Sequence, residues 1–195
     1  IAGYWALVTG ASSGIGREFC RQLAAAGLHL AMVARREDRL IELAGECERA
    51  HRTKTLVLPV DLSHPGAARE VKARLDEHSV RVRLLCNNAA SGRWGPCEDT
   101  SAETYEEMIQ LNAAALVALC SCLLPDLTSY PTSAIINVSS QAAYQPVPYM
   151  AVYAATKAFV QSFSQALYGE WKDKGVLVQT LVPETFSTTR YPIMA

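Results

Sequence analysis

A serine, a tyrosine and a lysine stand in an order and at a spacing that could carry out a proton transfer. Tyr153 and Lys157 are four positions apart, so on a helix their side chains lie on one face. A free phenol has a pKa of about 10, and a neighbouring ammonium group lowers it by favouring the phenolate. Tyr153 could then act as a general acid or base. Ser140, which follows an apolar run, could donate a hydrogen bond to a carbonyl oxygen where negative charge develops.

The same Tyr-x-x-x-Lys spacing occurs again at Tyr168 and Lys172. Ligands of open α/β sheets bind outside the carboxyl ends of the strands, and the helix that carries both pairs is expected to begin at that edge. Tyr168 would then lie roughly 20 Å further along the helix than Tyr153, at a rise of about 1.5 Å per residue. We therefore interpret the second pair as a feature of the helix surface.

The elements that must position these groups follow from the hydrophobic pattern, in which short β-rich runs alternate with helical stretches. The runs are apolar almost throughout, which is typical of strands buried on both faces of a parallel sheet. The expected strands are Trp5–Thr9, His29–Ala34, Thr55–Val60, Leu84–Asn87, Ala134–Ser139 and Leu177–Val182. The expected helices are Gly14–Ala26, Glu37–Arg52, Pro65–Ser79, Ala102–Leu124 and Val152–Lys174. We therefore predict one α/β domain over residues 1–195, a Rossmann-type doubly wound parallel sheet with helices on both faces.

A glycine-rich turn, Thr9 to Gly16, lies between the first strand and the first helix. Its small residues allow a tight turn and a close approach of the backbone to a ligand, and the following helix N-terminus attracts a pyrophosphate. The spacing is not G-x-G-x-x-G, and no lysine completes a P-loop. A glycine turn of this kind also occurs where helix packing alone requires it, so both interpretations stay open from this segment by itself.

The same turn contains Gly-x-Ser-x-Gly around Ser12, the pattern of a hydrolase nucleophile elbow. That chemistry requires a histidine later in the chain. The histidines are at positions 29, 51, 64 and 78, all before the midpoint. The pattern therefore does not predict a hydrolase.

The second strand ends in Arg35 and Arg36, with no acidic residue before Glu37. An acid at this point bonds a ribose 2′-hydroxyl, whereas arginine accommodates a 2′-phosphate. The pair favours NADP(H), and the alternative is a solvated helix N-terminus. Asp61, at the end of the third strand, could accept a hydrogen bond from an adenine amino group or cap the helix near Pro65, and the sequence leaves both open.

The composition excludes several other classes of function. A formal net charge of −1 gives no reason to expect a nucleic-acid partner. The six cysteines contain no C-x-x-C pair and no histidine at a ligand spacing, so we expect free thiols and no metal. The apolar stretch Ala113–Leu124 is shorter than the roughly 20 residues of a membrane span and is expected as a buried helix. Ile1–Tyr4 has no signal-peptide pattern, so we expect a cytoplasmic protein, with any upstream targeting segment left open.

Taken in order, the motifs resemble those of the short-chain dehydrogenase/reductase family. That family carries TGxxxGIG, NNAG, a catalytic Asn, Ser and YxxxK. Here Thr9–Gly16 matches in full, Asn87–Ala90 matches except for Ala90, and Asn112 occupies the place of the catalytic Asn. The resemblance implies that Asn112, Ser140, Tyr153 and Lys157 are catalytic, with Tyr153 as the proton donor. It also implies that Lys157 binds the nicotinamide ribose and that Asn112 holds a water molecule.

The resemblance and the residue patterns together predict the cofactor-binding set. It comprises Gly10, Ser12, Ser13, Gly14, Ile15, Gly16, Arg35, Arg36, Asp61, Leu62, Asn88, Ala89, Ala90, Tyr153, Lys157, Pro183, Phe186 and Thr188. Glu184 departs from the family pattern, which usually has glycine after Pro183, so the nicotinamide end is the less regular one. The sequence also ends before the family's final helix and strand, and we expect either a partial sequence or a shortened form.

We therefore predict an NADP(H)-dependent oxidoreductase that acts on a small carbonyl or alcohol substrate. The alternative is a non-catalytic NADP(H)-binding or scaffold protein of the same fold. Candidate substrate-pocket residues are aromatic or moderately apolar: Trp94, Gln141, Tyr144, Tyr149 and Met150. The family resemblance further implies a homodimer or homotetramer, although packing within a monomer explains the apolar helix stripes as well.

Overall fold

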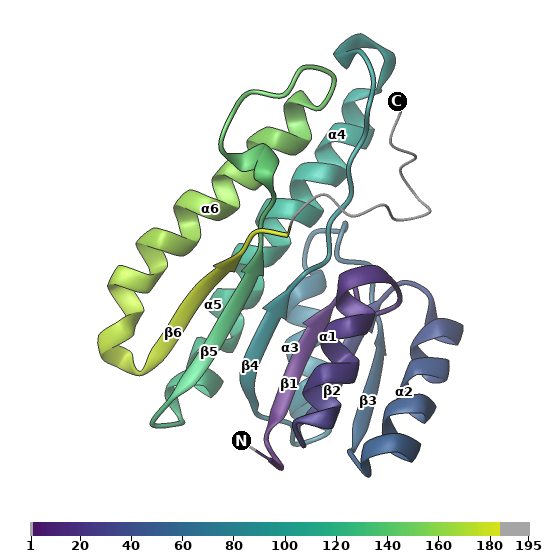
Figure 1. Ribbon diagram of the computed structural model, residues 1–195, viewed down its shortest axis with the longest axis vertical. Coiled ribbons are helices and arrows are strands. Elements are labelled where there is room, and N and C mark those ends of the chain that lie inside the picture. Colours follow the sequence, from purple (N-terminus) through teal and green to yellow (C-terminus); the bar gives the residue numbers. More distant parts are fainter. Residues whose placement is uncertain (1, 184–195) are drawn as a thin grey trace.

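A computed structural model of the chain describes residues 2–183, which form a six-stranded parallel sheet with helices on both faces (Figure 1). The strand order is β3-β2-β1-β4-β5-β6. The strands are β1 Trp5–Thr9, β2 His29–Ala34, β3 Thr55–Pro59, β4 Val82–Asn87, β5 Ser133–Val138 and β6 Val176–Leu181. The order reverses between β1 and β4, as in doubly wound dinucleotide-binding sheets. The predicted fold class is confirmed.

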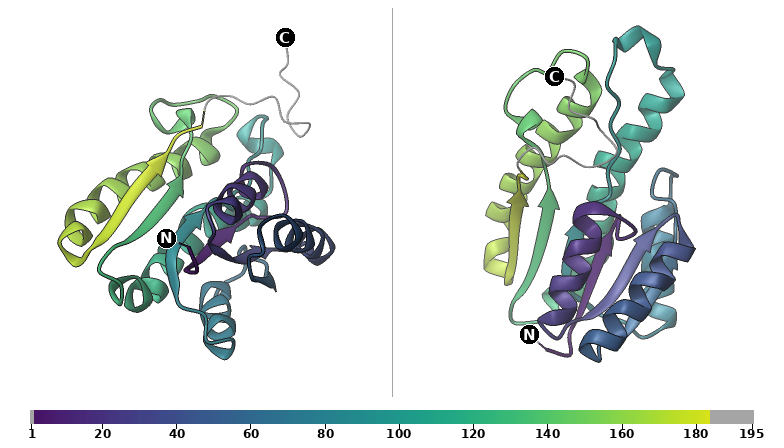
Figure 2. Two further views of the ribbon diagram at one scale, coloured as in Figure 1. Left: turned by 60° about the horizontal axis from the view of Figure 1, so that its bottom comes forward. Right: turned by 45° about the vertical axis from the view of Figure 1, so that its right-hand side comes forward.

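Two helices cover one face of the sheet and three cover the other (Figure 2). The first pair is α1 Gly14–Ala25 and α2 Glu37–His51. The opposite layer consists of α3 Ala67–Glu77, α5 Ala115–Thr128 and α6 Ala151–Trp171. Alternate residues of each strand therefore enter different cores. In β1, Leu7 packs with the α3 and α5 side, whereas Ala6 and Val8 pack with α1 and α2. This arrangement explains why the strands are apolar without alternation.

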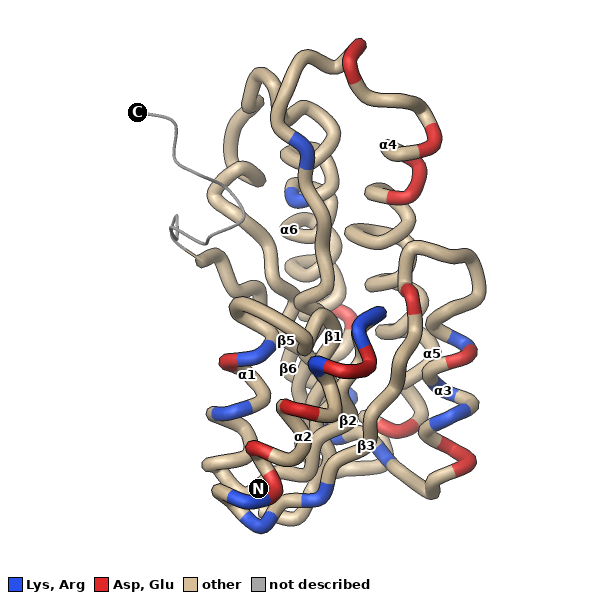
Figure 3. Tube along the Cα trace, turned by 90° about the vertical axis from the view of Figure 1, so that its right-hand side faces the viewer, with Lys and Arg blue, Asp and Glu red and all other residues tan. Residues whose placement is uncertain are grey.

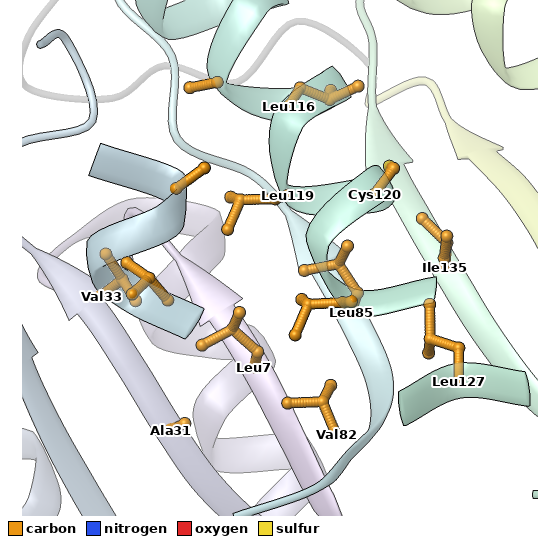
Figure 4. Close-up of a cluster of buried hydrophobic side chains, with 14 of the residues drawn as sticks. Leu7, Ala31, Val33, Val82, Leu85, Leu116, Leu119, Cys120, Leu127 and Ile135 are labelled. Carbon is orange, nitrogen blue, oxygen red and sulfur yellow. The ribbon is translucent and has the colours of Figure 1, made fainter. Parts of the chain in front are cut away.

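The core beneath α5 is the larger of the two and is drawn in Figure 4. Leu119 and Leu127 of α5 face Leu7, Leu85 and Ile135 from the central strands, and all five side chains are fully buried or nearly so. Complete burial of a leucine contributes roughly 1.5–3 kcal/mol. The central strands are thereby fixed, and so are the loops that leave their carboxyl ends.

The helix predicted over 102–124 is interrupted. It consists of α4 Ala102–Ile109, a π-helical turn Gln110–Ala114, and α5, which continues past Pro125 to Thr128. A proline inside a helix loses one hydrogen bond, but the turn that follows it is anchored. Asp126 is buried, accepts from the Val82 N–H at 3.3 Å and lies 3.1 Å from the Lys72 Nζ. These tertiary contacts extend the helix beyond the predicted end.

The continuous helical segment Ala102–Thr128 contains an 18-residue stretch with a mean hydropathy of 1.8, and it is long and apolar enough, by length and composition, to cross a membrane. In this structure its second half packs on the sheet, with Leu116, Leu119 and Leu123 in the core. The expectation that Ala113–Leu124 forms a buried helix agrees with this packing.

Charged side chains of both signs alternate over α1, α2 and α3, whereas acidic residues gather along α4 (Figure 3). Ion pairs connect α1 to α2, with Arg21 Nε 2.6 Å from Glu46 Oε1 and Arg17 Nη2 2.9 Å from Glu42 Oε1.

Candidate active site

A cavity of about 300 Å³ opens where the strand order reverses, between the loops that follow β1, β2, β3 and β4. Its lining residues are Gly10, Ser12, Ser13, Gly14, Ile15, Val33, Ala34, Arg35, Arg36, Val60, Asp61, Leu62, Asn88, Ala89, Ala90 and Leu111. Every predicted cofactor residue between positions 10 and 90 is among them except Gly16. Four further lining residues could not be predicted from the motifs, because they are apolar and resemble ordinary core residues: Val33, Ala34, Val60 and Leu111.

The glycine loop is packed too tightly for larger residues at two positions. Gly10 has φ +67°, and a Cβ there would lie 2.7 Å from Asn88 Nδ2. A Cβ on Gly16 would lie 2.3 Å from the carbonyl oxygen of Gly10, so Gly16 allows α1 to pack directly on the loop. Thr9 Oγ1 accepts from the Asn88 N–H at 2.9 Å, and Asn88 Nδ2 donates to the Thr9 carbonyl at 2.9 Å. The loops after β1 and β4 therefore form one rigid wall of the cavity.

Arg36 reaches across the cavity mouth to this loop. Its Nη2 donates to Ser12 Oγ at 3.0 Å and to Ser13 Oγ at 3.1 Å. Ser12 thus contacts a cationic donor rather than a base, which agrees with the exclusion of a hydrolase. A guanidinium and two hydroxyls on a glycine loop match the donors that a phosphate group requires.

Asp61 lies at the opposite side of the cavity. Its Oδ1 accepts from the N–H and hydroxyl of Ser63, and its Oδ2 lies 3.8 Å from Arg35 Nη1. Burial raises the pKa of Asp61, but the Ser63 hydrogen bonds and the charge of Arg35 outweigh it, so the pKa lies below its usual value. The alternative role as a helix cap is wrong, because Gly66 is the N-cap of α3 and Asp61 instead closes a turn with Ser63.

The end of β5 and the start of α6 bring the predicted catalytic residues together. Lys157 Nζ donates to the Val138 carbonyl at 2.8 Å and lies 5.8 Å from the centroid of the Tyr153 ring. Lys157 is 4% exposed, and burial lowers its pKa to about 8. Ser139, which the sequence analysis passed over, donates to the Lys157 carbonyl at 3.0 Å. The next residue, Ser140, is the N-cap of a short 3-10 helix, Gln141–Ala143, and its Oγ accepts from the Ala142 N–H.

Asn112 lies in the π-helical turn and is buried. Its Oδ1 accepts from the Ser91 N–H at 2.9 Å, and its Nδ2 donates to the Ser91 carbonyl at 2.8 Å and to Thr156 Oγ1 at 3.1 Å. Thr156 in turn donates to the Tyr153 carbonyl at 2.7 Å. Asn112 therefore connects the loop after β4 to the helix turn that carries Tyr153. π-helical turns frequently occur at functional sites.

Gly92, on the same loop, lies against the Tyr153 ring. A Cβ at Gly92 would be 3.1 Å from Tyr153 Cδ2, a contact tighter than ordinary packing. Sequence reasoning missed Ser91 and Gly92, and their only signal was their place directly after Asn87–Ala90.

Other predicted residues lie elsewhere or beyond the described part of the chain. Tyr168 and Lys172 are exposed at the far end of α6, as expected for a surface pair. Pro183 follows β6 and does not line the cavity. Glu184, Phe186 and Thr188 lie outside the described residues. Within residues 2–183, no group of three or more His, Cys, Asp or Glu side chains could bind a metal ion.

A glycine loop at the reversal point of a parallel sheet, with a Ser-Tyr-Lys set at the same edge, defines a nucleotide-binding α/β protein of the dehydrogenase class. Residues 4–191 match the family model described as short chain dehydrogenase. The chain belongs to this family, which confirms the resemblance drawn from its motifs.

Individual relatives agree with this assignment. The very-long-chain 3-oxoacyl-CoA reductase of Bos taurus is 32% identical over 95% of this chain, and the match spans 60% of that relative's length. The bulky-bulky ketone specific alcohol dehydrogenase of Comamonas testosteroni superposes with a TM-score of 0.90 at 32% identity, over 98% of this chain and 76% of that one. A short-chain dehydrogenase from Sphingobium yanoikuyae in complex with NADPH gives a TM-score of 0.86 at 36% identity, over 92% and 70% of the two chains.

Proposed function

We propose that this protein is an NADP(H)-dependent oxidoreductase that moves a hydride between nicotinamide and a carbonyl or alcohol substrate. One observation carries the proposal. The arginine-lined cavity lies at the carboxyl ends of the strands, and so does the set formed by Tyr153, Lys157 and Asn112. Asn112 and the loop after β4 connect the two. A binding site and a proton-transfer group are thus adjacent.

The residues fit a dinucleotide in both shape and charge. Gly10 and Gly16 permit the close backbone approach, and the α1 N-terminus provides N–H groups for a pyrophosphate. When bound, the nicotinamide supplies the hydride. The chain's own contribution is the proton: Tyr153 donates it to the carbonyl oxygen during reduction, with the Lys157 charge favouring the phenolate that remains. Ser140 orients the carbonyl by hydrogen bonding.

The preference for NADP(H) over NAD(H) rests on Arg35 and Arg36 at the end of β2. Both line the cavity, and the acidic residue that would bind a free 2′-hydroxyl is replaced by these two cations. The Sphingobium yanoikuyae relative, whose structure contains NADPH, supports the same choice.

The test is the affinity for NADPH and NADH, measured by calorimetry on the protein and on Arg35→Ala/Arg36→Ala. Hydrogen bonds to charged groups contribute roughly 1.5–3 kcal/mol each, so NADPH affinity should fall by about 100-fold or more while NADH affinity changes little. Arg39→Ala, an exposed arginine one turn further along α2, is the control. Equal affinity for the two nucleotides, or no loss in the double variant, would overturn the proposal.

We also propose that the outer faces of α5 and α6 pair with a second copy of the chain. Phe159 of α6 is 45% exposed and stacks on the partly buried Phe163, with ring centroids 5.9 Å apart. Light scattering should give at least a dimer at micromolar concentration, and a monomer at every concentration would remove this proposal.

A further inference from the structure

Two large aromatic side chains stand exposed side by side on the two loops that lead to Gly92 and Tyr153. The Trp94 and Tyr149 rings have centroids 6.0 Å apart and planes inclined by 35°, and the side chains are 59% and 58% exposed. They come from different segments: Trp94 from the loop after β4, and Tyr149 from the loop that precedes α6. We call them the aromatic pair. Adjoining aromatic side chains with this degree of exposure are typical of surfaces that bind apolar partners.

The backbone fixes the pair in place. The Gly95 N–H donates to the Tyr149 carbonyl at 2.9 Å and so ties the two loops together. Tyr149 has φ +65°, a left-handed conformation that costs energy for a bulky residue. Such strain persists only where the surroundings enforce it, and it concentrates at functional sites. The strained backbone at Tyr149 therefore indicates a functional role for the ring that it places beside Trp94.

The aromatic pair lies beside the reacting group. Gly92, which lies against the Tyr153 ring, is two positions before Trp94, and Tyr149 is four positions before Tyr153, just outside the start of α6 at Ala151. Consecutive Cα atoms are about 3.8 Å apart, so both rings are within reach of a molecule whose carbonyl is at Tyr153. The surrounding segment 144–150 is also largely apolar. It contains Pro146, Val147 and Pro148, and Gln145 is the one residue in it with an amide side chain.

We propose that the aromatic pair binds an apolar ring system next to the reacting carbonyl, so that the substrates are bulky cyclic ketones or the matching alcohols. This inference rests on the proposed function, because it assumes that the carbonyl is reduced at Tyr153. Truncating either ring removes apolar contact area from a ring-bearing substrate and none from a substrate too small to reach the pair. Losing one buried aromatic contact corresponds to about a 10- to 100-fold change in affinity.

The test compares a bicyclic ketone, a small acyclic ketone and a polyhydroxylated ketone as substrates of the full-length protein with NADPH. In Trp94→Ala and Tyr149→Ala, kcat/KM for the bicyclic ketone should fall about 10- to 100-fold, while the value for the acyclic ketone stays close to that of the parent. Trp94→Phe keeps an aromatic ring and should retain most of the parent's kcat/KM for the bicyclic ketone. Tyr168→Ala, which removes an exposed ring at the far end of α6, is the matched control.

An equal fall for all three ketones would mean a general structural effect and would overturn the inference. So would a preference for the polyhydroxylated ketone, or no change in either variant. Calorimetric binding of the bicyclic ketone to the NADPH-loaded protein separates this inference from the proposed function. If the bicyclic ketone binds and Trp94→Ala weakens this binding about 10- to 100-fold, the pair is supported even when no ketone is turned over. Binding without turnover would refute the proposed function alone. No binding of the bicyclic ketone would refute the pair.

Discussion

At the scale of single residues, Lys157 is a buried cation in the site. Its ammonium is almost completely buried and donates a hydrogen bond to the backbone carbonyl of Val138. Desolvation opposes the charge and lowers the pKa to about 8. A lysine so placed destabilises the fold in its charged form. Its position over the Tyr153 ring gives a functional reason for retaining it.

This placement predicts a pH-dependent stability. The folded-state pKa of Lys157 is depressed, so between about 8 and the ordinary 10.5 the unfolded chain binds more protons, and stability rises with pH through that window. Lys157→Met should therefore be more stable than the parent near neutral pH. That advantage should shrink by about 2.5 kcal/mol between about pH 7 and about pH 10. Urea unfolding at the two pH values measures it, with the exposed Lys54→Met as control. A constant difference would contradict the account.

Gly92 carries a second prediction at this scale. Alanine at Gly92 would place a Cβ 3.1 Å from Tyr153 Cδ2 and displace the ring by a few tenths of an ångström. Because misplacement by about 1 Å can reduce rates about 100-fold, kcat for Gly92→Ala should fall several-fold, with NADPH affinity unchanged. Tyr153 would still be present, so the pH profile should keep its shape. Gly45→Ala, at a helical glycine with open space around it, should leave kcat unchanged. A kcat equal to that of the parent would show that Gly92 does not position the ring.

At the scale of elements, the π-helical turn Gln110–Ala114 is the feature that assembles the site. It presents Asn112 to both Ser91 and Thr156, and thereby connects the loop after β4 with α6. Asn112 is buried, and its hydrogen bonds are buried or partly buried, so each partner left unsatisfied costs free energy when the amide is removed.

Asn112→Ala should accordingly lower the free energy of unfolding by roughly 2–4 kcal/mol, since it leaves the Ser91 N–H and carbonyl without their side-chain partners. It should also reduce kcat, because Thr156 and Tyr153 lose their fixed position. Denaturant unfolding and steady-state kinetics measure the two effects. Gln110→Ala, which removes an amide from the same turn, should have a small effect on both. Comparable losses in the two variants would contradict the assignment to Asn112.

The elements also show what could be predicted from the sequence. β1 and β2 agree with prediction at both ends, because continuous apolar runs with glycine or arginine boundaries define them. β4 begins earlier than predicted, at Val82. The charged Arg83 is accommodated in this strand because its guanidinium lies over the Tyr4 ring at 4.1 Å and donates to the Thr132 carbonyl. The π-helical turn and the Gly92 contact depend on packing between distant segments, which local patterns do not encode.

At the scale of the whole molecule, the sheet topology brings the site together. The cavity is lined by the loops after β1 to β4 and by Leu111, and the proton-transfer group comes from β5 and α6. The strand-order reversal separates the loops after β1 and β4, which is where this fold class binds its ligands. Motif order in the sequence could predict this convergence, whereas the orientation of Arg36 toward Ser12 and Ser13 required the structure.

The most direct test of the central claim is single-turnover oxidation of NADPH by a ketone in the parent and in Tyr153→Phe, with NADPH affinity measured in parallel. Removing the phenolic hydroxyl should slow hydride transfer by about 100- to 10,000-fold, the range of general acid catalysis, and should leave NADPH affinity within a few-fold of the parent. Equal rates in the two proteins would contradict the role of Tyr153. NADPH binding without turnover of any ketone or alcohol by the parent would instead favour a non-catalytic binding protein of the same fold.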